Sequence, residues 1–439
     1  MWRSGRDLNP CRGFAVPSLA SRPPDHGYLI NRADDRDRTG DLNLGKVPRY
    51  QLRYVRKLQL PERIDQQEQG KSIAGKAHLP SRKFEPLEYL RVMLEFAKTH
   101  SEPYFWMAGK SARNCLEIRH DVAALDEPGF WAVIAPFVGE PTFARFETVS
   151  ESEFVGEGSW PGIAANWESS FSRNEYLNYV ETIRNEIADG WVYQVNACRI
   201  LSAPIPDGVS LRPLMSDLLE NNPAPHSLYL NLPTMEIASA SPELFMRVTK
   251  TAQGERNVIS SPIKGTSATS EFLEKDLAEN VMIVDLIRND LSVICETGTV
   301  AVPRLLGIEK HPGLYHLVSD VSGTLRKNIS WADIFAAMMA PGSVSGAPKS
   351  SALEVISRME PSSRGPYCGA IGWVCDGDAN LAVGIRTFWN QRDGYLRFGT
   401  GAGITWGSNA PSEWEETELK ANRLIAIASG KTIESAVKF

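Results

Sequence analysis

The sequence predicts a globular protein that mixes α-helices with β-strands, and three observations support this. Of its 439 residues, 42% are hydrophobic and 23% are charged, which is the balance of a chain that can bury a large core. Several segments repeat apolar residues at the spacing of an amphipathic helix. Other segments, such as residues 130–135, are short apolar runs typical of buried strands.

The N-terminal part of the chain differs from the rest. It is rich in Arg, Asp, Pro and Gly and shows no sustained apolar period, so we expect residues 1–75 to be a disordered extension or a misassigned start. A basic arm that binds a partner is the alternative, because the first 70 residues carry 13 basic and 9 acidic side chains. A helix is then predicted over residues 84–94 and a strand over residues 130–135.

A helix with clear boundaries is predicted from Ser172 to Gly190. Ser172 and Glu175 form a capping box, and Gly190 is a typical C-terminal stop. One apolar stripe runs along it, made by Tyr176, Val180, Ile183 and Ile187. A strand is predicted next, over residues 191–201.

A second helix is predicted over residues 271–290. Asp276 and Glu279 are three residues apart, so they lie on neighbouring turns and can reach a shared point. A solvated acidic edge is the alternative. The predicted apolar stripe consists of Leu273, Leu277, Val281 and Val284.

Two further helices and a strand complete the C-terminal half. One helix follows residues 342–349, with Pro348 near its first turn, and its free N–H groups can hold an anion or simply start the helix. A strand over residues 397–404 is expected to run into a glycine-rich bend. The last helix opens with a capping box at Ser412, and Glu413, Glu416 and Lys420 share one of its faces.

Composition excludes several classes of protein. No apolar run approaches the roughly 18 residues that span a bilayer, and no signal-peptide core follows the first residues, so we expect a cytoplasmic protein without membrane contact. Beyond residue 70 the chain carries 34 basic against 44 acidic side chains, which argues against a nucleic-acid groove. The six cysteines show no zinc-site spacing, and none lies in the Gly-x-Cys-x-Gly elbow of a glutaminase.

Two short segments carry candidate chemistry. Residues 261–266, Ser-Pro-Ile-Lys-Gly-Thr, place Lys264 in a glycine-hinged turn, and residues 241–243, Ser-Pro-Glu, place Glu243 after a proline. We interpret Lys264 as a nucleophile and Glu243 as an acid. Taken alone, each pattern is also an ordinary turn or cap.

Together, the motifs of residues 171–430 resemble the chorismate-utilising enzymes, a family that includes anthranilate synthase component I, aminodeoxychorismate synthase component I, isochorismate synthase and salicylate synthase. The resemblance rests on eight separated motifs in the family's order. They are Tyr193-Gln194-Val195-Asn196, Ser241-Pro242-Glu243, Pro262-Ile263-Lys264-Gly265-Thr266, residues 279–290, His316-Leu317-Val318-Ser319, Ser345-Gly346-Ala347-Pro348-Lys349, Gly401-Ala402-Gly403-Ile404 and residues 413–417.

The resemblance implies an α+β fold with a large antiparallel two-sheet β-sandwich, surrounding helices, and a site in the cleft between the sheets. Residues 76–170 would form the N-terminal part of the sandwich and residues 171–432 the chorismate-binding catalytic region. It also implies Mg²⁺, with Glu279 and Glu416 at the positions of its ligands and Glu413 and Asp276 close by. Mg²⁺ suits such a site because it accepts hard oxygen ligands and keeps waters.

The substrate-binding residues follow from the same resemblance. Arg386, Tyr367, Lys420 and the amides near Gly401 would hold a carboxylate of chorismate, and an arginine can do so with two hydrogen bonds. Core packing is the alternative for Tyr367 and His316. The residues expected around the ring and its hinge are Gln194, Gly265, Thr266, His316 and Ser343.

Two positions distinguish members of the family. Water-adding relatives have a lysine base where this chain has Gln194, and a neutral amide cannot deprotonate water, so ammonia is the expected nucleophile. Lys264 stands where the anthranilate-forming branch has alanine and the aminodeoxychorismate-forming branch has lysine. We therefore expect Lys264 to form a covalent adduct with Glu243 as general acid, with the pKa of Lys264 lowered and that of Glu243 raised by burial.

These features predict aminodeoxychorismate synthase component I, which makes 4-amino-4-deoxychorismate for 4-aminobenzoate and folate. Ammonia would come from a separate glutamine amidotransferase subunit, because the chain carries no glutaminase motif. Anthranilate synthase component I is the nearest alternative. A non-catalytic chorismate-binding subunit is the alternative from another class.

Overall fold

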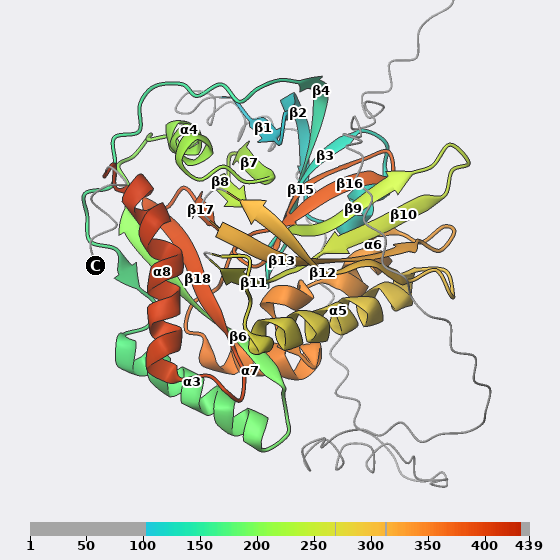
Figure 1. Cartoon of the computed structure of the whole chain (residues 1–439). Helices are drawn as coiled ribbons and strands as arrows, with labels where there is room; N and C mark the ends of the chain where they lie inside the picture. The colour runs from blue at the N-terminus through green and yellow to red at the C-terminus, as the bar shows by residue number, and fades with distance from the viewer. Residues whose placement is uncertain (1–101, 268, 312–313, 432–439) are drawn as a thin grey trace, which may run out of the picture. The chain divides into compact units, whose positions relative to one another are not determined.

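The computed structural model describes residues 102–431 except 268 and 312–313. In this part of the chain, eighteen strands pair into one antiparallel sheet, and six α-helices pack around it (Figure 1). The α+β prediction is confirmed. The predicted N-terminal extension and the helix over residues 84–94 lie outside the described residues.

The helices and strands alternate irregularly along the chain. The helices are α3 (Arg173–Ala188), α4 (Arg212–Asn221), α5 (Glu274–Ile294), α6 (Trp331–Met338), α7 (Lys349–Met359) and α8 (Ala410–Ala428), with 3₁₀ turns η2 (Val122–Asp126) and η3 (Gly342–Val344). The strands are β1 (Tyr104–Met107), β2 (Lys110–Arg119), β3 (Phe130–Ala135), β4 (Thr142–Glu151), β5 (Glu168–Ser169), β6 (Gln194–Pro204), β7 (His226–Asn231), β8 (Glu236–Ser241), β9 (Leu244–Lys250), β10 (Arg256–Ser261), β11 (Ile263–Ser267), β12 (Ala301–His311), β13 (Leu314–Thr324), β14 (Gly346–Ala347), β15 (Ala370–Cys375), β16 (Asp378–Val383), β17 (Thr387–Asn390) and β18 (Tyr395–Ile404).

The predicted division into two separate sheets is not observed. Strand pairing continues in the order β5, β6, β18, β17, β8, β7, β1, β2, β4, β3, β15, β16, β9, β10 and β13, with β11 and β12 both on β13. The ladder is unbroken because β1 pairs with both β2 and β7, which joins the two halves.

Two hydrophobic cores stabilise this sheet. The larger core joins Trp131 and Phe143 of β3 and β4 with Val195 of β6 and Ala402 of β18. Those strands are far apart in the pairing order, so the sheet must fold back on itself to bring them together. The smaller core lies where α4 and α8 cover β7, β8, β17 and β18, and Figure 1 shows α8 along β18.

Several predicted elements are confirmed. The capping box of α3 is present: the Ser172 hydroxyl accepts from Glu175 N, and Ser172 N donates to the Glu175 carboxylate at 2.7 Å. β3 spans the predicted residues 130–135, and Pro348 stands at the N-cap of α7. The strand predicted over residues 191–201 is β6, which begins three residues later at Gln194.

Three local predictions are wrong. Leu273, Leu277 and Val281 of the predicted α5 stripe are exposed, because α5 instead turns Asn280 and Ile283 toward the sheet. The cap of α8 is Asn409 and not Ser412; the Asn409 side chain accepts from Ser412 N at 3.2 Å. Residues 399–404 continue as strand β18 and form no bend, because they pair with β6 throughout.

Among the described residues, no helix is both long enough and apolar enough to cross a membrane.

Candidate active site

Three side chains from separate elements meet at one carboxylate. Lys264 comes from β11, Glu279 from α5 and Gln194 from the first position of β6. The Lys264 Nζ lies 2.9 Å from Glu279 Oε1, and the Gln194 amide nitrogen donates to the same oxygen. Gln194 is only 1% exposed, and its own oxygen Oε1 has no partner among the described residues. The structure thus brings the predicted nucleophile, one predicted metal ligand and Gln194 together.

Gly403 of β18 makes room for this cluster, whereas a Cβ at Gly399 would meet the Tyr367 ring and one at Gly401 would meet the Ala197 oxygen and the Cys198 sulfur. Gly399, Gly401 and Gly403 occupy alternate positions, so they face the same side of the sheet. A Cβ at Gly403 would lie 2.5 Å from the Gln194 amide nitrogen and 2.8 Å from Glu279 Oε1. Gly403 therefore allows the site side chains to pack closely against a strand. That the amides near Gly401 hold a substrate carboxylate stays a prediction.

Asn280 donates a hydrogen bond to the backbone of Lys264, and the sequence-based prediction did not include it among the site residues. Its amide nitrogen donates to the backbone oxygens of Lys264 at 3.4 Å and Leu317 at 3.1 Å, and its oxygen accepts from the Ser319 hydroxyl at 2.6 Å. Asn280 is buried in a helix whose predicted apolar stripe ignored it. The sequence feature that could have indicated its role is that Asn280 directly follows the predicted ligand Glu279.

The Lys264–Glu279 ion pair sets the charges of both groups. Burial is the largest single influence and lowers the pKa of Lys264, but the carboxylates of Glu279, Glu243 and Glu416 together outweigh it, so the pKa lies above its ordinary value. The prediction of a lowered pKa for Lys264 is therefore wrong for this state of the protein. Burial likewise raises the pKa of Glu279, and Lys264 and Gln194 outweigh it, so that pKa is lowered.

Glu243 lies in different surroundings. It lies in the short connection between β8 and β9, directly before Leu244, and is only 3% exposed. Burial raises the pKa of Glu243 to about 7, against hydrogen bonds from Ser343 and from the Ile263 backbone and the charge of Lys264, which lower it. The predicted direction for Glu243 is confirmed. A carboxyl group with this pKa can hold a proton near neutral pH and donate it.

The remaining predicted acids lie on α8 and at the start of α5. Glu416 pairs with Lys420 at 2.6 Å, and Lys420 also donates to the Gly401 oxygen at 3.1 Å. Burial raises the pKa of Glu413, and the nearby Glu416 adds to this. Asp276 caps α5 by accepting from Leu273 N at 3.1 Å, which directs its carboxylate to the helix end.

The carboxylates fit a magnesium ion only as a site that substrate and water complete. No three acidic, histidine or cysteine side chains converge as a metal cluster within the described ranges. In this structure Glu279 pairs with Lys264 and Glu416 pairs with Lys420. Both carboxylates raise the pKa of Lys264. Two carboxylates are enough for Mg²⁺ when a substrate and waters supply the other ligands.

Arg386 has the features of an anion-binding residue. Its side chain makes no hydrogen bond or ion pair within the described part of the chain, although burial is extensive enough to lower its pKa, with Arg423 adding to the effect. Its backbone is left-handed, with φ of 52°. A part-buried cation without a counter-ion is costly, and a bound carboxylate would remove that cost.

Three predicted ring-lining positions belong to β11 and β13. Thr266 pairs with His316 across these strands, and His316 is buried. Gly265 has φ of 91°, and a Cβ there would lie 3.1 Å from Phe272, so only glycine fits this hinge. These positions adjoin Lys264 in sequence or in pairing.

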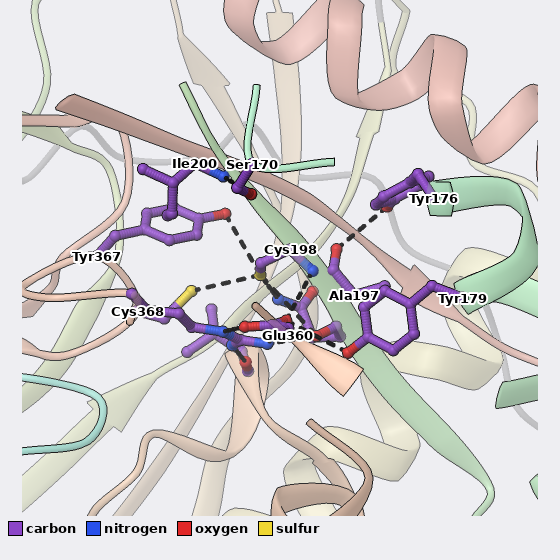
Figure 2. Close-up of polar contacts among 12 residues, drawn as sticks. Ser170, Tyr176, Tyr179, Ala197, Cys198, Ile200, Glu360, Tyr367 and Cys368 are labelled. Atoms are coloured by element: carbon purple, nitrogen blue, oxygen red, sulfur yellow. Dashed lines mark hydrogen bonds and ion pairs between the residues drawn. The ribbon is translucent and has the colours of Figure 1, made fainter. Parts of the chain in front are cut away.

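Tyr367 belongs to a buried polar cluster under β6, shown in Figure 2. Its hydroxyl points to the Cys198 sulfur at 3.8 Å, and its ring fills the space left by Gly399. In the same cluster Glu360 accepts from Cys198 N at 3.1 Å and from the Tyr179 hydroxyl at 3.3 Å. This geometry favours the packing alternative for Tyr367.

The chain is similar to known proteins in sequence and in fold. Residues 149–426 match the model of the family described as chorismate binding enzyme. Anthranilate synthase component 1 of Saccharolobus solfataricus is 37% identical over 273 residues, covering 59% of this chain and 63% of that protein. Aminodeoxychorismate synthase component 1 of Klebsiella aerogenes is 34% identical over 281 residues, covering 60% of each.

The chain thus spans about three fifths of the length of these two relatives. Among the similar relatives the name anthranilate synthase component 1 is the more frequent. The fold is similar to a putative isochorismate synthase of Bacillus anthracis, with a TM-score of 0.63 at 22% identity over 77% of this chain and 98% of that one. The family match covers more than half of the sequence and includes the whole candidate site, so this chain belongs to the chorismate binding enzyme family.

Proposed function

We propose that this protein binds chorismate and replaces its C4 hydroxyl with an amine derived from ammonia, which gives 4-amino-4-deoxychorismate. The observation that carries the proposal is the position of Lys264. Its amine lies 2.9 Å from Glu279 Oε1, beside the buried Gln194, in a site that also holds the protonatable Glu243. An amine in that position can reach a bound ring, whereas alanine could not react.

The proposed chemistry has two displacement steps. Lys264 Nζ bonds to ring C2 as the C4–oxygen bond breaks, and Glu243 gives its proton to the departing hydroxyl, which leaves as water. Ammonia then bonds to C4 as the bond between C2 and the lysine nitrogen breaks, which restores the neutral Lys264, and the new C4 ammonium group returns a proton to the Glu243 carboxylate. The first step needs a neutral Lys264. The Glu279 carboxylate favours the charged form of Lys264, so Lys264 must lose its proton when substrate binds.

The other residues bind and orient. The uncompensated Arg386 would hold a carboxylate of chorismate. A magnesium ion, held by Glu279 and Glu416, would supply positive charge to a substrate carboxylate. Gln194 supports ammonia as the nucleophile, because its neutral amide cannot take a proton from water and its unpartnered oxygen can accept an N–H hydrogen bond. The ammonia would come from a separate glutamine amidotransferase subunit.

Anthranilate formation is the second candidate. The observation that favours it is the greater number of relatives named anthranilate synthase component 1. In that case Lys264 would be tolerated in the site and would form no adduct.

A product assay distinguishes the two candidates. The full-length protein is incubated with chorismate, a magnesium salt and an ammonium salt. Our proposal predicts no fluorescent anthranilate, and formation of 4-aminobenzoate only after an aminodeoxychorismate lyase is added. Anthranilate as the product would overturn the assignment, and chorismate binding without turnover would indicate a non-catalytic subunit.

A further inference from the structure

The residues around Glu243 include a buried ion pair that the proposed chemistry does not use. Asp290 of α5 and Lys349 of α7 pair at 2.6 Å, and their side chains are 8% and 15% exposed. Asp290 lines the same small cavity as Glu243 and Ser343. The titratable groups around Glu243 are therefore Lys264 from β11 and, across the cavity, Asp290 from α5.

Ser343, the hydrogen-bond partner of Glu243, lies in a short turn that is not stable without its neighbours. The 3₁₀ turn η3 contains three residues, 342–344, and a helical turn of that length is not stable alone. Its internal support consists of long hydrogen bonds, from Val344 N to Pro341 O at 3.2 Å and from Ser345 to Gly342 O, at 3.4 Å from the backbone N and 3.3 Å from the hydroxyl. The position of Ser343 must therefore be set by neighbouring elements.

Lys349 ties the two ends of this segment together. Besides Asp290, its ammonium group donates to the Met338 oxygen at 3.1 Å. Met338 is the last residue of α6 and Lys349 the first of α7, so one side chain bridges the residues before and after the η3 segment. Asp290 fixes that bridge to α5.

The turn is also pressed against the helix that carries Asp290. A Cβ at Gly342 would lie 2.9 Å from the Leu286 side chain and 3.8 Å from Asp290 Oδ2. On the other side, the buried Arg364 donates to the Val344 oxygen at 3.0 Å and is paired with Glu360. Two cations, the part-buried Lys349 and the buried Arg364, thus support the segment around η3. Of their partners, Asp290 and Met338 of the Lys349 bridge line the cavity of Glu243.

We propose that Asp290 and Lys349 are positioning residues, which hold η3 so that the Ser343 hydroxyl stays directed at Glu243. The role of Glu243 as acid rests on the proposed function, but the positioning itself does not. Without the bridge, Ser343 moves away and the Glu243 carboxylate loses a hydrogen bond. Loss of a hydrogen bond to a charged group is expected to raise the pKa of Glu243 by about one unit.

The test measures the proton on Glu243 directly. Infrared difference spectra between the wild type and Glu243→Gln, recorded across pH without substrate, isolate the carboxyl band of Glu243. We compare the wild type with Ser343→Ala and with the double variant Asp290→Leu/Lys349→Met. The double variant removes both charges together, because replacing a buried pair by apolar residues usually preserves the fold. Asp285→Asn is the matched control, since Asp285 is an exposed acid of the same helix paired with Arg288.

We expect the double variant and Ser343→Ala to shift the Glu243 titration upward by about one pH unit, and Asp285→Asn to leave it unchanged. With chorismate and ammonium, kcat of the double variant should fall by at least about tenfold with little change in KM. A lower melting temperature with an unmoved titration would overturn the proposal, because a purely structural pair has that effect. If the double variant shifts the Glu243 titration but the wild type forms no 4-amino-4-deoxychorismate, the proposed function is refuted and the positioning role is retained.

Discussion

The two ends of the candidate site contain the same kind of side chain in opposite surroundings. Glu243 is buried where burial dominates, and its pKa rises to about 7. Burial acts on Glu279 as well, but Lys264 at 2.9 Å and Gln194 outweigh it and lower the pKa. One glutamate is therefore suited to carry a proton and the other to remain an anion, and the neighbours rather than the residue type decide this.

Replacing Lys264 with alanine tests the charged end of this comparison and has the largest expected effect. We expect Lys264→Ala to reduce formation of 4-amino-4-deoxychorismate by at least about a thousandfold, because the attacking amine is lost. The assay is steady-state turnover with ammonium, coupled to the lyase. Lys310→Ala, an exposed lysine of β12, is the control. Wild-type turnover in Lys264→Ala would remove the covalent step.

Replacing Glu243 with glutamine tests the neutral end through stability. The folded-state pKa of about 7 exceeds the ordinary 4.5, so the stabilising neutral form is fully present below pH 4.5 and is lost as pH rises through 7. Relative to Glu243→Gln, the wild type should lose about 2–3 kcal/mol of unfolding free energy between pH 5 and pH 8. Urea unfolding at the two pH values measures this.

The exposed Glu354 provides the control for that comparison. Glu354→Gln should follow the wild type at both pH values. Equal pH dependence in the wild type and Glu243→Gln would mean that the Glu243 carboxyl is not held neutral in the folded protein.

Removing a carboxylate from the charged end should weaken metal binding. We expect Glu279→Ala and Glu416→Ala each to lower the affinity for Mg²⁺ by at least about tenfold in the presence of chorismate, because each removes an oxygen ligand. Calorimetric titration with Mg²⁺, without ammonia, measures the change. Glu415→Ala alters an exposed acid of the same helix and should have no effect. Unchanged affinity in both site variants would place the ion elsewhere.

A methyl group on β18 should disturb the charged end and spare Glu243. In Gly403→Ala the new Cβ would meet the Gln194 nitrogen at 2.5 Å and Glu279 Oε1 at 2.8 Å. Overpacking of this kind costs about 1–3 kcal/mol, so kcat/KM should fall by roughly tenfold. Gly407→Ala is the matched control, because no atom lies within 4 Å of its Cβ position. Equal activity of the two variants would show that the cluster can move aside.

Part of the site could be predicted from the sequence because it depends on residue identity in short motifs. The lysine at position 264, where one branch of the family has alanine, predicts an amine nucleophile. The glutamine at position 194, where water-adding relatives have lysine, predicts that the site has no base for water. Both predictions depend only on which residue stands at the position. The capping box of α3 and strand β3 were predictable for the same reason, since both depend on neighbouring residues.

Other features could not be predicted, because they depend on contacts between distant segments. The face of α5 is one example: Leu273 and Leu277 fit the helical period, but Asn280 turns inward to bond the backbones of β11 and β13. The raised pKa of Lys264 is another, because Glu279 is fifteen residues away in sequence and 2.9 Å away in space. Periodicity alone carries no information about either partner.

The residues themselves determined which chemical groups this protein has: an amine at position 264, an amide at 194 and carboxylates at 243 and 279. Only the tertiary structure decided in which direction the pKa of each ionisable group shifts. A pKa depends on burial and on the nearest charges, and both are set by which strands and helices meet. For the same reason, the pairing of Asp290 with Lys349 and the close approach of Gly403 to Gln194 and Glu279 could be seen only in the folded structure.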